Sequence, residues 1–280
     1  MDEHDRGLAF DLSNLVTRRR ALTLLGGVVA AVVVGCSGDD DSTSAGASST
    51  SSTTTAGSGA VSTTIAAGAA ACSAAIPEET AGPFPGDGSN GPDALSESGI
   101  VRSDITSSFG SSTTKAAGVP VTVNLLIQDQ ANGCAPMADA AVYVWHCDRE
   151  GRYSMYSPGA TDENYLRGVQ KTDGSGRASF TSIVPACYSG RWPHIHFEVY
   201  SNVDDATNGG SPIATSQLAV PEDTCKTVYA VAGYEQSVRN LSQVSLAHDN
   251  VFGDDGAAHQ LANVSGSVDA GYTFELNVPV

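Results

Sequence analysis

Short runs of apolar residues alternate with polar ones along the second half of the chain. A period of two, with many β-branched and aromatic residues, is typical of strands that bury one face. The runs lie at residues 119–127, 141–146, 177–183, 194–200 and 272–278. Glycine and Asx residues at 132–133 and 173–176 favour tight turns. Because no window after residue 35 has an apolar 3.6 period long enough for a major helix, the pattern predicts an all-β fold, an antiparallel β-sandwich.

The first 35 residues have a different pattern. Three arginines at 18–20 precede an uncharged stretch at 21–35, which is too short to span a bilayer comfortably. We interpret residues 1–35 as an export signal peptide of the twin-arginine type. The sequence Val-Val-Gly-Cys that ends at Cys36 resembles a bacterial lipobox. Cys36 is therefore expected to carry a lipid that anchors the protein to the outer face of the cell membrane. An ordinary secretory peptide with an incidental cysteine is the alternative.

Residues 36–71 are mostly Ser, Thr, Ala, Gly and Asp. They offer too few large apolar side chains to offset the entropy lost on ordering, so this stretch is predicted to be a disordered linker behind the lipidated cysteine. The remaining residues, 72–280, are enough for one domain with a substantial core.

The chain is acidic, with 14 Lys and Arg residues against 31 Asp and Glu residues and a formal net charge of −17. Such a surface repels nucleic acid, which is therefore not expected as a partner. Solubility outside the cell is the simplest explanation of the charge.

Five cysteines follow Cys36, at positions 72, 134, 147, 187 and 225. An oxidising compartment favours disulfide formation, but five is an odd number and the pairing cannot be read from the sequence. No CxxC spacing indicates a zinc site.

The run at 194–200 contains two of the six histidines of the chain. Residues two apart in a strand point to the same face, so His194 and His196 are expected to project together, while Ile195 and Phe197 point into apolar packing. Two adjacent imidazoles can bind a metal ion at two points. Taken alone, the pair also fits surface histidines or hydrogen-bonded histidines at the edge of the core.

The residues around this pair help to decide between a metal site and the other interpretations of the two histidines. Between residues 140 and 199 the chain reads AAVYVWHCDREGRYS and, after a short gap, YLRGVQKTDGSGRASFTSIVPACYSGRWPHIHFEV. This stretch resembles the intradiol ring-cleavage dioxygenases, which are the protocatechuate and catechol enzymes, and especially their exported relatives. EETAGPF at 78–84 and VRSDI at 101–105 resemble the same group. The resemblance extends over roughly residues 72–221.

The resemblance implies four iron ligands, Tyr153, Tyr188, His194 and His196. Phenolate is a hard, strongly donating anion that suits a trivalent ion, so the implied cofactor is non-haem Fe(III). Residues 72–280 would then be a catalytic domain that cleaves a catechol with O₂ to a cis,cis-muconate-type product. In the family mechanism the catechol displaces the second tyrosinate, here Tyr188, which can take up a substrate proton.

Two further residues are implied to take part in catalysis. Arg191 stands where the family places an arginine that stabilises negative charge on the substrate. Gln217 matches a glutamine near the substrate, although an insertion at 204–212 blurs the register; a solvated strand residue is the alternative. His146 follows the pattern of the exported group and is interpreted as supporting the site or the fold rather than as a ligand.

Other interpretations remain open from the sequence. The fold alone does not give activity, so a cell-surface β-sandwich binding module is an alternative, as is a protein that holds another metal through His194 and His196. A disulfide between Cys147 and Cys187 would brace the site, but Cys134 is an equally available partner for either. No helical region before the first strand offers a dimerisation element, and the oligomeric state is left open. The other aromatic and imidazole side chains are interpreted as sheet or surface residues: Tyr156, Tyr165, Tyr200, Tyr229, Tyr234, His248 and His259.

Overall fold

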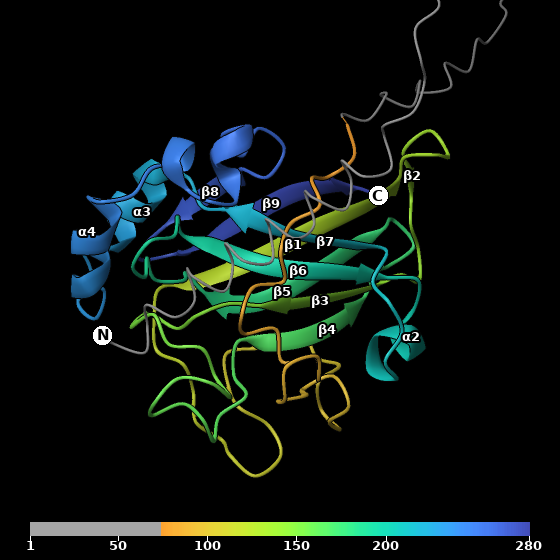
Figure 1. Cartoon of the computed structure of the whole chain (residues 1–280), viewed down its shortest axis with the longest axis horizontal. Coiled ribbons are helices and arrows are strands. Elements are labelled where there is room, and N and C mark those ends of the chain that lie inside the picture. Colours follow the sequence, from red (N-terminus) through yellow and green to blue (C-terminus); the bar gives the residue numbers. More distant parts are fainter. Residues whose placement is uncertain (1–73) are drawn as a thin grey trace, which may run out of the picture. The chain divides into compact units, whose positions relative to one another are not determined.

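The computed structural model describes residues 74–280, which contain two β-sheets and several short helices (Figure 1). The predicted signal peptide, the lipidated Cys36 and the linker lie outside the described residues. The five-stranded sheet consists of β1 (Pro120–Asp129), β2 (Ala135–Pro136), β5 (Arg177–Ile183), β8 (Asn263–Ser267) and β9 (Gly271–Pro279). The four-stranded sheet has the order β4-β3-β6-β7 and consists of β3 (Ala141–Trp145), β4 (Arg167–Lys171), β6 (His194–Tyr200) and β7 (Ala214–Ala219).

Helical segments are short and lie between strands. They are α2 (Val203–Thr207), α3 (Glu222–Val228), α4 (Glu235–Leu241) and the two 3₁₀ turns η2 (Leu246–His248) and η3 (Phe252–Asp254). Helices α3 and α4 cover one end of the sheets, and α2 lies at the opposite end (Figure 1). Within residues 74–280, no helix is both long enough and apolar enough to cross a membrane.

The predicted runs match strands β1, β3, β5, β6 and β9 to within a few residues. The mostly sheet structure agrees with the all-β prediction. The prediction of antiparallel strands is wrong for one pair, because β1 and β9 are parallel, with Val121 opposite Tyr272. These two strands are far apart in the sequence, so the chain between them supplies the long crossover that a parallel pair needs.

Alternation along β1 shows why these residues form a strand. Its even-numbered positions from Thr122 to Gln128 are half-buried, whereas Val121, Val123, Leu125 and Ile127 are buried. These four side chains join one apolar cluster with Ile195, Phe197 and Val199 of β6 and with Phe274, Leu276 and Val278 of β9. The two sheets therefore share a core, which fixes the register of β6 and sends its other side chains to the opposite face.

Strand β6 is buried at every position, from His194 to Tyr200. Its second face is covered by a leading segment, defined here as residues 74–118, which runs across the four-stranded sheet and is drawn in orange to yellow in Figure 1. Backbone hydrogen bonds attach this segment to β7, through Glu79, and further along the chain to β4, through Arg102. A second apolar cluster, which includes Leu95 and Ile100, packs there against Trp145. This layer encloses the face on which the predicted site lies.

The cysteines of the described residues do not brace the site covalently. Cys147, Cys187 and Cys225 are buried free thiols, so the possible Cys147–Cys187 disulfide is not formed. Cys134 is disulfide-bonded, and none of these three is its partner.

Candidate functional site

Strand β6 places His194 and His196 side by side on the face that the leading segment covers. His196 lies between Trp145 of β3 and Gln217 of β7 in the strand register. Its ring stacks on the Trp145 indole, with centroids 4.8 Å apart and an interplanar angle of 6°. The expectation that the two histidines project together is therefore met, and the indole restricts the rotation of His196.

The tautomer of His194 is set by the backbone. Its Nδ1 lies 2.6 Å from the carbonyl oxygen of Trp192, which can only accept, so Nδ1 carries the proton and Nε2 has a bare lone pair. That Nε2 lies 3.1 Å from Nε2 of His196 and 3.2 Å from Oη of Tyr188. Two polar groups thus converge on one nitrogen lone pair, whose ordinary capacity is a single hydrogen bond.

Tyr153 completes the group. Its side chain is buried, and its hydroxyl has no hydrogen-bond partner in the described part of the protein. The Tyr153 ring lies 5.9 Å from the Tyr188 ring and 6.3 Å from the His196 ring, both edge-on. The structure therefore brings all four predicted ligands together in one cluster, although they come from two turns and a strand.

Burial governs the charge states of this cluster. The pKa of His194 is lowered to about 3, first by burial and then by the charge of Arg191. The pKa of His196 is lowered well below its usual value by burial and by His194. For Tyr153, burial and the neighbouring Tyr188 phenol raise the pKa well above the ordinary range. The imidazoles are therefore neutral and able to donate lone pairs at neutral pH.

Asp148 shapes the turn that carries Tyr153. The buried carboxylate accepts backbone hydrogen bonds from Glu150 and Arg152, both at 2.9 Å, and the Tyr165 hydroxyl donates to it at 3.0 Å. The Arg152 guanidinium also pairs with it, at 2.8 Å. These bonds close the turn around Gly151 and fix the direction in which Tyr153 leaves it.

Gly151 lets the two tyrosine-bearing turns approach each other. It has φ +85°, a conformation that glycine adopts without strain, and a Cβ at this position would lie 3.3 Å from Cβ of Tyr188. Tyr188 itself follows Cys187, whose backbone is held by Ser237 and Asn240 of α4, at 3.0 and 2.8 Å. Helix α4 therefore helps to position the second phenol.

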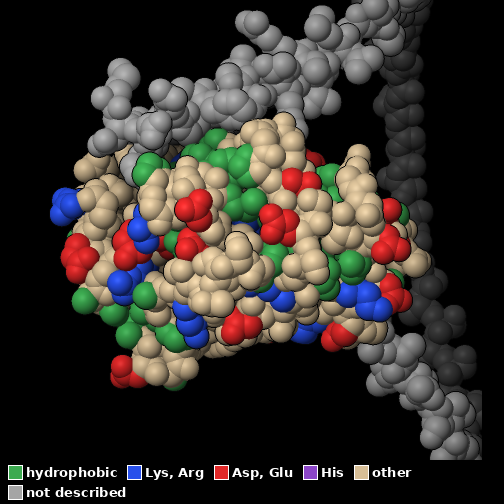
Figure 2. Space-filling view, turned by 90° about the horizontal axis from the view of Figure 1, so that it is seen from below, with side chains coloured by type: hydrophobic (Ala, Val, Ile, Leu, Met, Phe, Trp, Pro, Cys, Tyr) green, Lys and Arg blue, Asp and Glu red, His purple; other side chains and the backbone are tan. Residues whose placement is uncertain are grey.

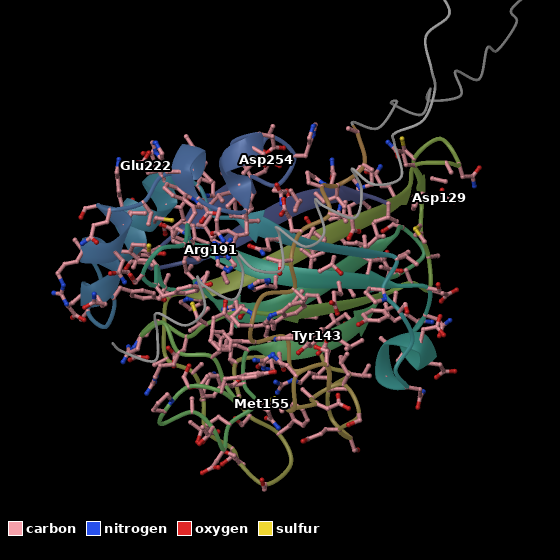
Figure 3. The ribbon with its side chains drawn as sticks, in the orientation of Figure 1. Asp129, Tyr143, Met155, Arg191, Glu222 and Asp254 are labelled. Atoms are coloured by element: carbon pink, nitrogen blue, oxygen red, sulfur yellow. The ribbon has the colours of Figure 1, made fainter. Side chains whose placement is uncertain are left out.

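Arg191 is buried beside the cluster, near the centre of the view in Figure 3. Its Nε donates to Asp249 at 3.0 Å and its Nη2 to the Gln217 carbonyl at 2.7 Å. The Gln217 amide nitrogen donates in turn to the backbone of Thr80 at 3.0 Å. The alternative that Gln217 is a solvated strand residue is wrong, because the side chain is fully buried and both ends of its amide are used.

Several residues that support the site have no signal in the sequence pattern. The sequence pattern does not indicate the hydrogen-bond partners of Asp148, Tyr165 or Asp249. Trp192 supports the site through its backbone and not through its side chain. Only the position of Asp148, beside the tyrosine motif, could have drawn attention to it. His146 contacts no ligand: its ring nitrogens lie 2.8 Å from the Cys147 carbonyl and 2.7 Å from the Ser182 hydroxyl, which fits the supporting role expected of it.

The donor set fits a trivalent iron ion. Residues 74–280 contain no group of three or more His, Cys, Asp and Glu side chains placed to hold a metal ion. The cluster instead combines two neutral imidazoles with two phenols, one of which is buried and has no hydrogen-bond partner in the described part of the chain. A cation among these four groups would satisfy the lone pairs that the protein leaves unmatched.

Comparison with known families identifies the same part of the chain. Residues 100–204 match the family model described as Dioxygenase. The matched region contains Tyr153, Tyr188, Arg191 and both site histidines.

Individual relatives agree with this match. A 54-residue stretch is 41% identical to catechol 1,2-dioxygenase 2 of Acinetobacter lwoffii, over 19% of this chain and 19% of that protein. Catechol 1,2-dioxygenase 1 of the same organism is 39% identical over 54 residues, 19% of this chain and 17% of that protein. The chain thus spans only about a fifth of the length of these curated relatives.

A solved structure extends the likeness beyond this stretch. It is the intradiol ring-cleavage dioxygenase from Tetranychus urticae, with a TM-score of 0.54 and 26% identity over 65% of this chain and 87% of that one. The family model, the sequence relatives and this solved structure thus all make the chain similar to dioxygenases.

Proposed function

We propose that this protein is a non-haem Fe(III) dioxygenase that opens the aromatic ring of a catechol between its two hydroxylated carbons, using O₂. The observation that carries the proposal is the convergence of Tyr153, Tyr188, His194 and His196, with the two imidazole Nε2 atoms 3.1 Å apart. Ferric iron held by these residues would supply a Lewis acid that binds both catechol oxygens and activates the ring toward O₂.

The two phenols have different surroundings, which suit different roles. Tyr153 is 2% exposed and lies under Phe84, with ring centroids 4.9 Å apart, so it is enclosed and stays in place. Tyr188 is only half-buried, and its hydroxyl lies beside His194. Tyr188 is therefore the phenol suited to give way to substrate. As the phenolate that ferric iron would hold, its Oη would accept a proton from the catechol.

Arg191 provides a fixed positive charge next to the substrate. A guanidinium is charged at all relevant pH values, and one that is already oriented stabilises developing negative charge without reorganisation. Asp249 and Gln217 hold it from two sides. Because the Gln217 amide is used by Arg191 and by the Thr80 backbone, we assign Gln217 the orientation of Arg191 rather than direct contact with substrate.

The test is the colour and the product of the iron-loaded protein. Tyrosinate on ferric iron absorbs visible light, so the loaded protein should be red-brown, catechol should shift the band, and O₂ should then give a muconate. Tyr153→Phe and Tyr188→Phe should each change the band. Tyr165→Phe is the matched control. Its hydroxyl binds Asp148 and not the cluster, and Asp148 keeps its bonds to the Glu150 and Arg152 backbone that close the Tyr153 turn, so the band should stay. A colourless protein that binds catechol without product would favour the binding module.

We also propose that the enzyme acts outside the cytoplasm, anchored through a lipid on Cys36. Support comes from the arginines at 18–20 and the lipobox-like sequence before Cys36. With the native signal, the protein should fractionate with membranes, and Cys36→Ser should move it to the soluble fraction without loss of its activity on catechol. Equal membrane association of both forms would refute the anchor.

A further inference from the structure

A group of hydrogen-bond acceptors borders the site on the side of the leading segment. Glu79 lies at its centre and is only 6% exposed. Its backbone nitrogen donates to Thr215 of β7 at 2.8 Å, and the next residue, Thr80, accepts the hydrogen bond of Gln217. Gln217 also accepts a hydrogen bond from Arg191, the residue proposed to stabilise negative charge on the substrate. Two hydrogen bonds therefore connect the Thr80 backbone, next to Glu79, with Arg191.

No cation pairs with Glu79 among the described residues. Its carboxylate accepts one hydrogen bond, from Nε2 of Gln260 at 3.4 Å. Burial and then the negative charge of Asp254 raise its pKa to about 8, while Arg191 acts in the opposite direction. A carboxyl group in this position lacks a positively charged donor.

Gln260 provides independent evidence of a missing donor. Its side chain is fully buried, and its Nε2 is directed to Glu79 and to Ser216 Oγ, at 3.4 and 3.3 Å. The carbonyl oxygen of the same planar amide is buried and has no hydrogen-bond partner among residues 74–280. An acceptor without a partner among the described residues, next to a carboxyl group that has no cationic partner there, suits a ligand with N–H donors.

The turn η3 brings further negative charge to the rim of this group. Phe252, at the start of η3, lies 6.4 Å from the His194 ring and 5.9 Å from Cζ of Arg191, so η3 packs against the metal cluster. Asp254 ends η3 and Asp255 follows it; both are exposed and both act on the pKa of Glu79. Arg191 opposes these charges at Glu79, but it also forms a buried ion pair with Asp249.

We propose that Glu79, Gln260 and Asp254 form a cation subsite of the catechol pocket, which takes the ammonium group of an aminoalkyl-substituted catechol. An ammonium supplies three N–H donors and a positive charge, which matches a carboxyl group, an amide oxygen and a nearby carboxylate. The same charges disfavour catechols that carry a carboxylate. This inference rests on the proposed function, since it assumes that the ring binds at the four-residue cluster.

The test compares three catechols with a two-carbon chain at position 4, ending in an amine, a hydroxyl or a carboxylate. Titration calorimetry of the iron-loaded protein without O₂ gives a Kd for each. We expect the amine to bind most tightly and the carboxylate most weakly. In Glu79→Gln the ratio of carboxylate Kd to amine Kd should fall about tenfold, because an amide cannot give up a proton to form a charged pair with the ammonium. Asp254→Asn, at an exposed position, should lower this ratio severalfold.

Glu222→Gln is the matched control, because it removes the same charge from an exposed site on α3 that is already paired with Lys226 (Figure 3). It should leave the ratio unchanged. Equal affinities for the three compounds, or a ratio that Glu79→Gln does not alter, would overturn the subsite, and so would failure of all three to bind. Binding of unsubstituted catechol without muconate formation in O₂ would instead refute the dioxygenase activity and leave the affinity ratio as a separate result.

Discussion

Asp249 uses all four lone-pair positions of its carboxylate inside the protein. Oδ1 accepts from the backbone nitrogens of Val251 and Phe252, at 2.9 and 3.0 Å. Oδ2 accepts from Arg191 Nε at 3.0 Å and from the Trp192 nitrogen at 2.7 Å. Burial alone would raise the pKa of Asp249, but Arg191 and these hydrogen bonds hold it below its usual value. One carboxylate therefore orients the charged arginine and the residue whose carbonyl sets the His194 tautomer.

Asp249→Asn should impair turnover more than binding. An amide has only one acceptor atom, and its NH₂ group would face N–H donors, so Arg191 would lose its fixed orientation. We expect kcat on catechol to fall at least about tenfold, since an oriented charge acts mainly in the transition state. KM should change less. The unfolding free energy should fall by about 3 kcal/mol, the scale for breaking a buried ion pair. Steady-state kinetics and urea unfolding measure both effects.

A purely structural role would give a different result. In that case the folded fraction would fall, while kcat per folded, iron-loaded molecule would stay the same. Asp223→Asn serves as control, because this carboxylate is exposed on α3 and takes part in no ion pair in the described chain. It should change neither quantity.

At the scale of elements, strands with one polar face could be predicted from the sequence and fully covered strands could not. Strands β1 and β5 alternate clearly, and their bounds follow the predicted runs. Strand β7 is buried at all six positions, because the core lies on one side and the leading segment on the other. Its sequence, ATSQLA, therefore has no alternation that would separate it from a loop. The parallel pairing of β9 was missed for another reason: no local pattern encodes which distant strand it joins.

The residues of the site also divide into those that the sequence pattern predicts and those that it does not. Period two predicts that His194 and His196 share a face, and the structure shows this. The two tyrosines lie in turns, where no periodicity specifies side-chain direction, so only the family resemblance could pair them with the histidines. Asp249 was missed because it lies 58 residues after Arg191, in a region rich in Gly, Asp and Asn. Long-range hydrogen bonds of this kind depend on the complete fold.

For the molecule as a whole, negative charge is spread over the surface. The chain has a formal net charge of −17, and the face in Figure 2 shows acidic side chains interspersed with basic ones. This distribution provides no continuous basic surface on that face. Binding of nucleic acid is therefore not part of the proposed function.

Iron should also contribute to the stability of the entire domain. The cluster buries nitrogen and oxygen lone pairs that residues 74–280 do not satisfy. A cation bound only to the folded state shifts the unfolding equilibrium toward that state. A metal concentration about 100 times its Kd stabilises by about 2.7 kcal/mol. For a domain of this size that corresponds to roughly 5–10 °C in Tm.

Thermal unfolding of the ferric protein and of the same protein after chelation should show this difference. Tyr153→Phe removes a phenol whose hydroxyl has no other partner among the described residues, so it should reduce the difference by at least about half. Tyr165→Phe should lower both Tm values and keep the difference between them. Equal Tm values with and without iron would mean that these four side chains do not bind the metal together.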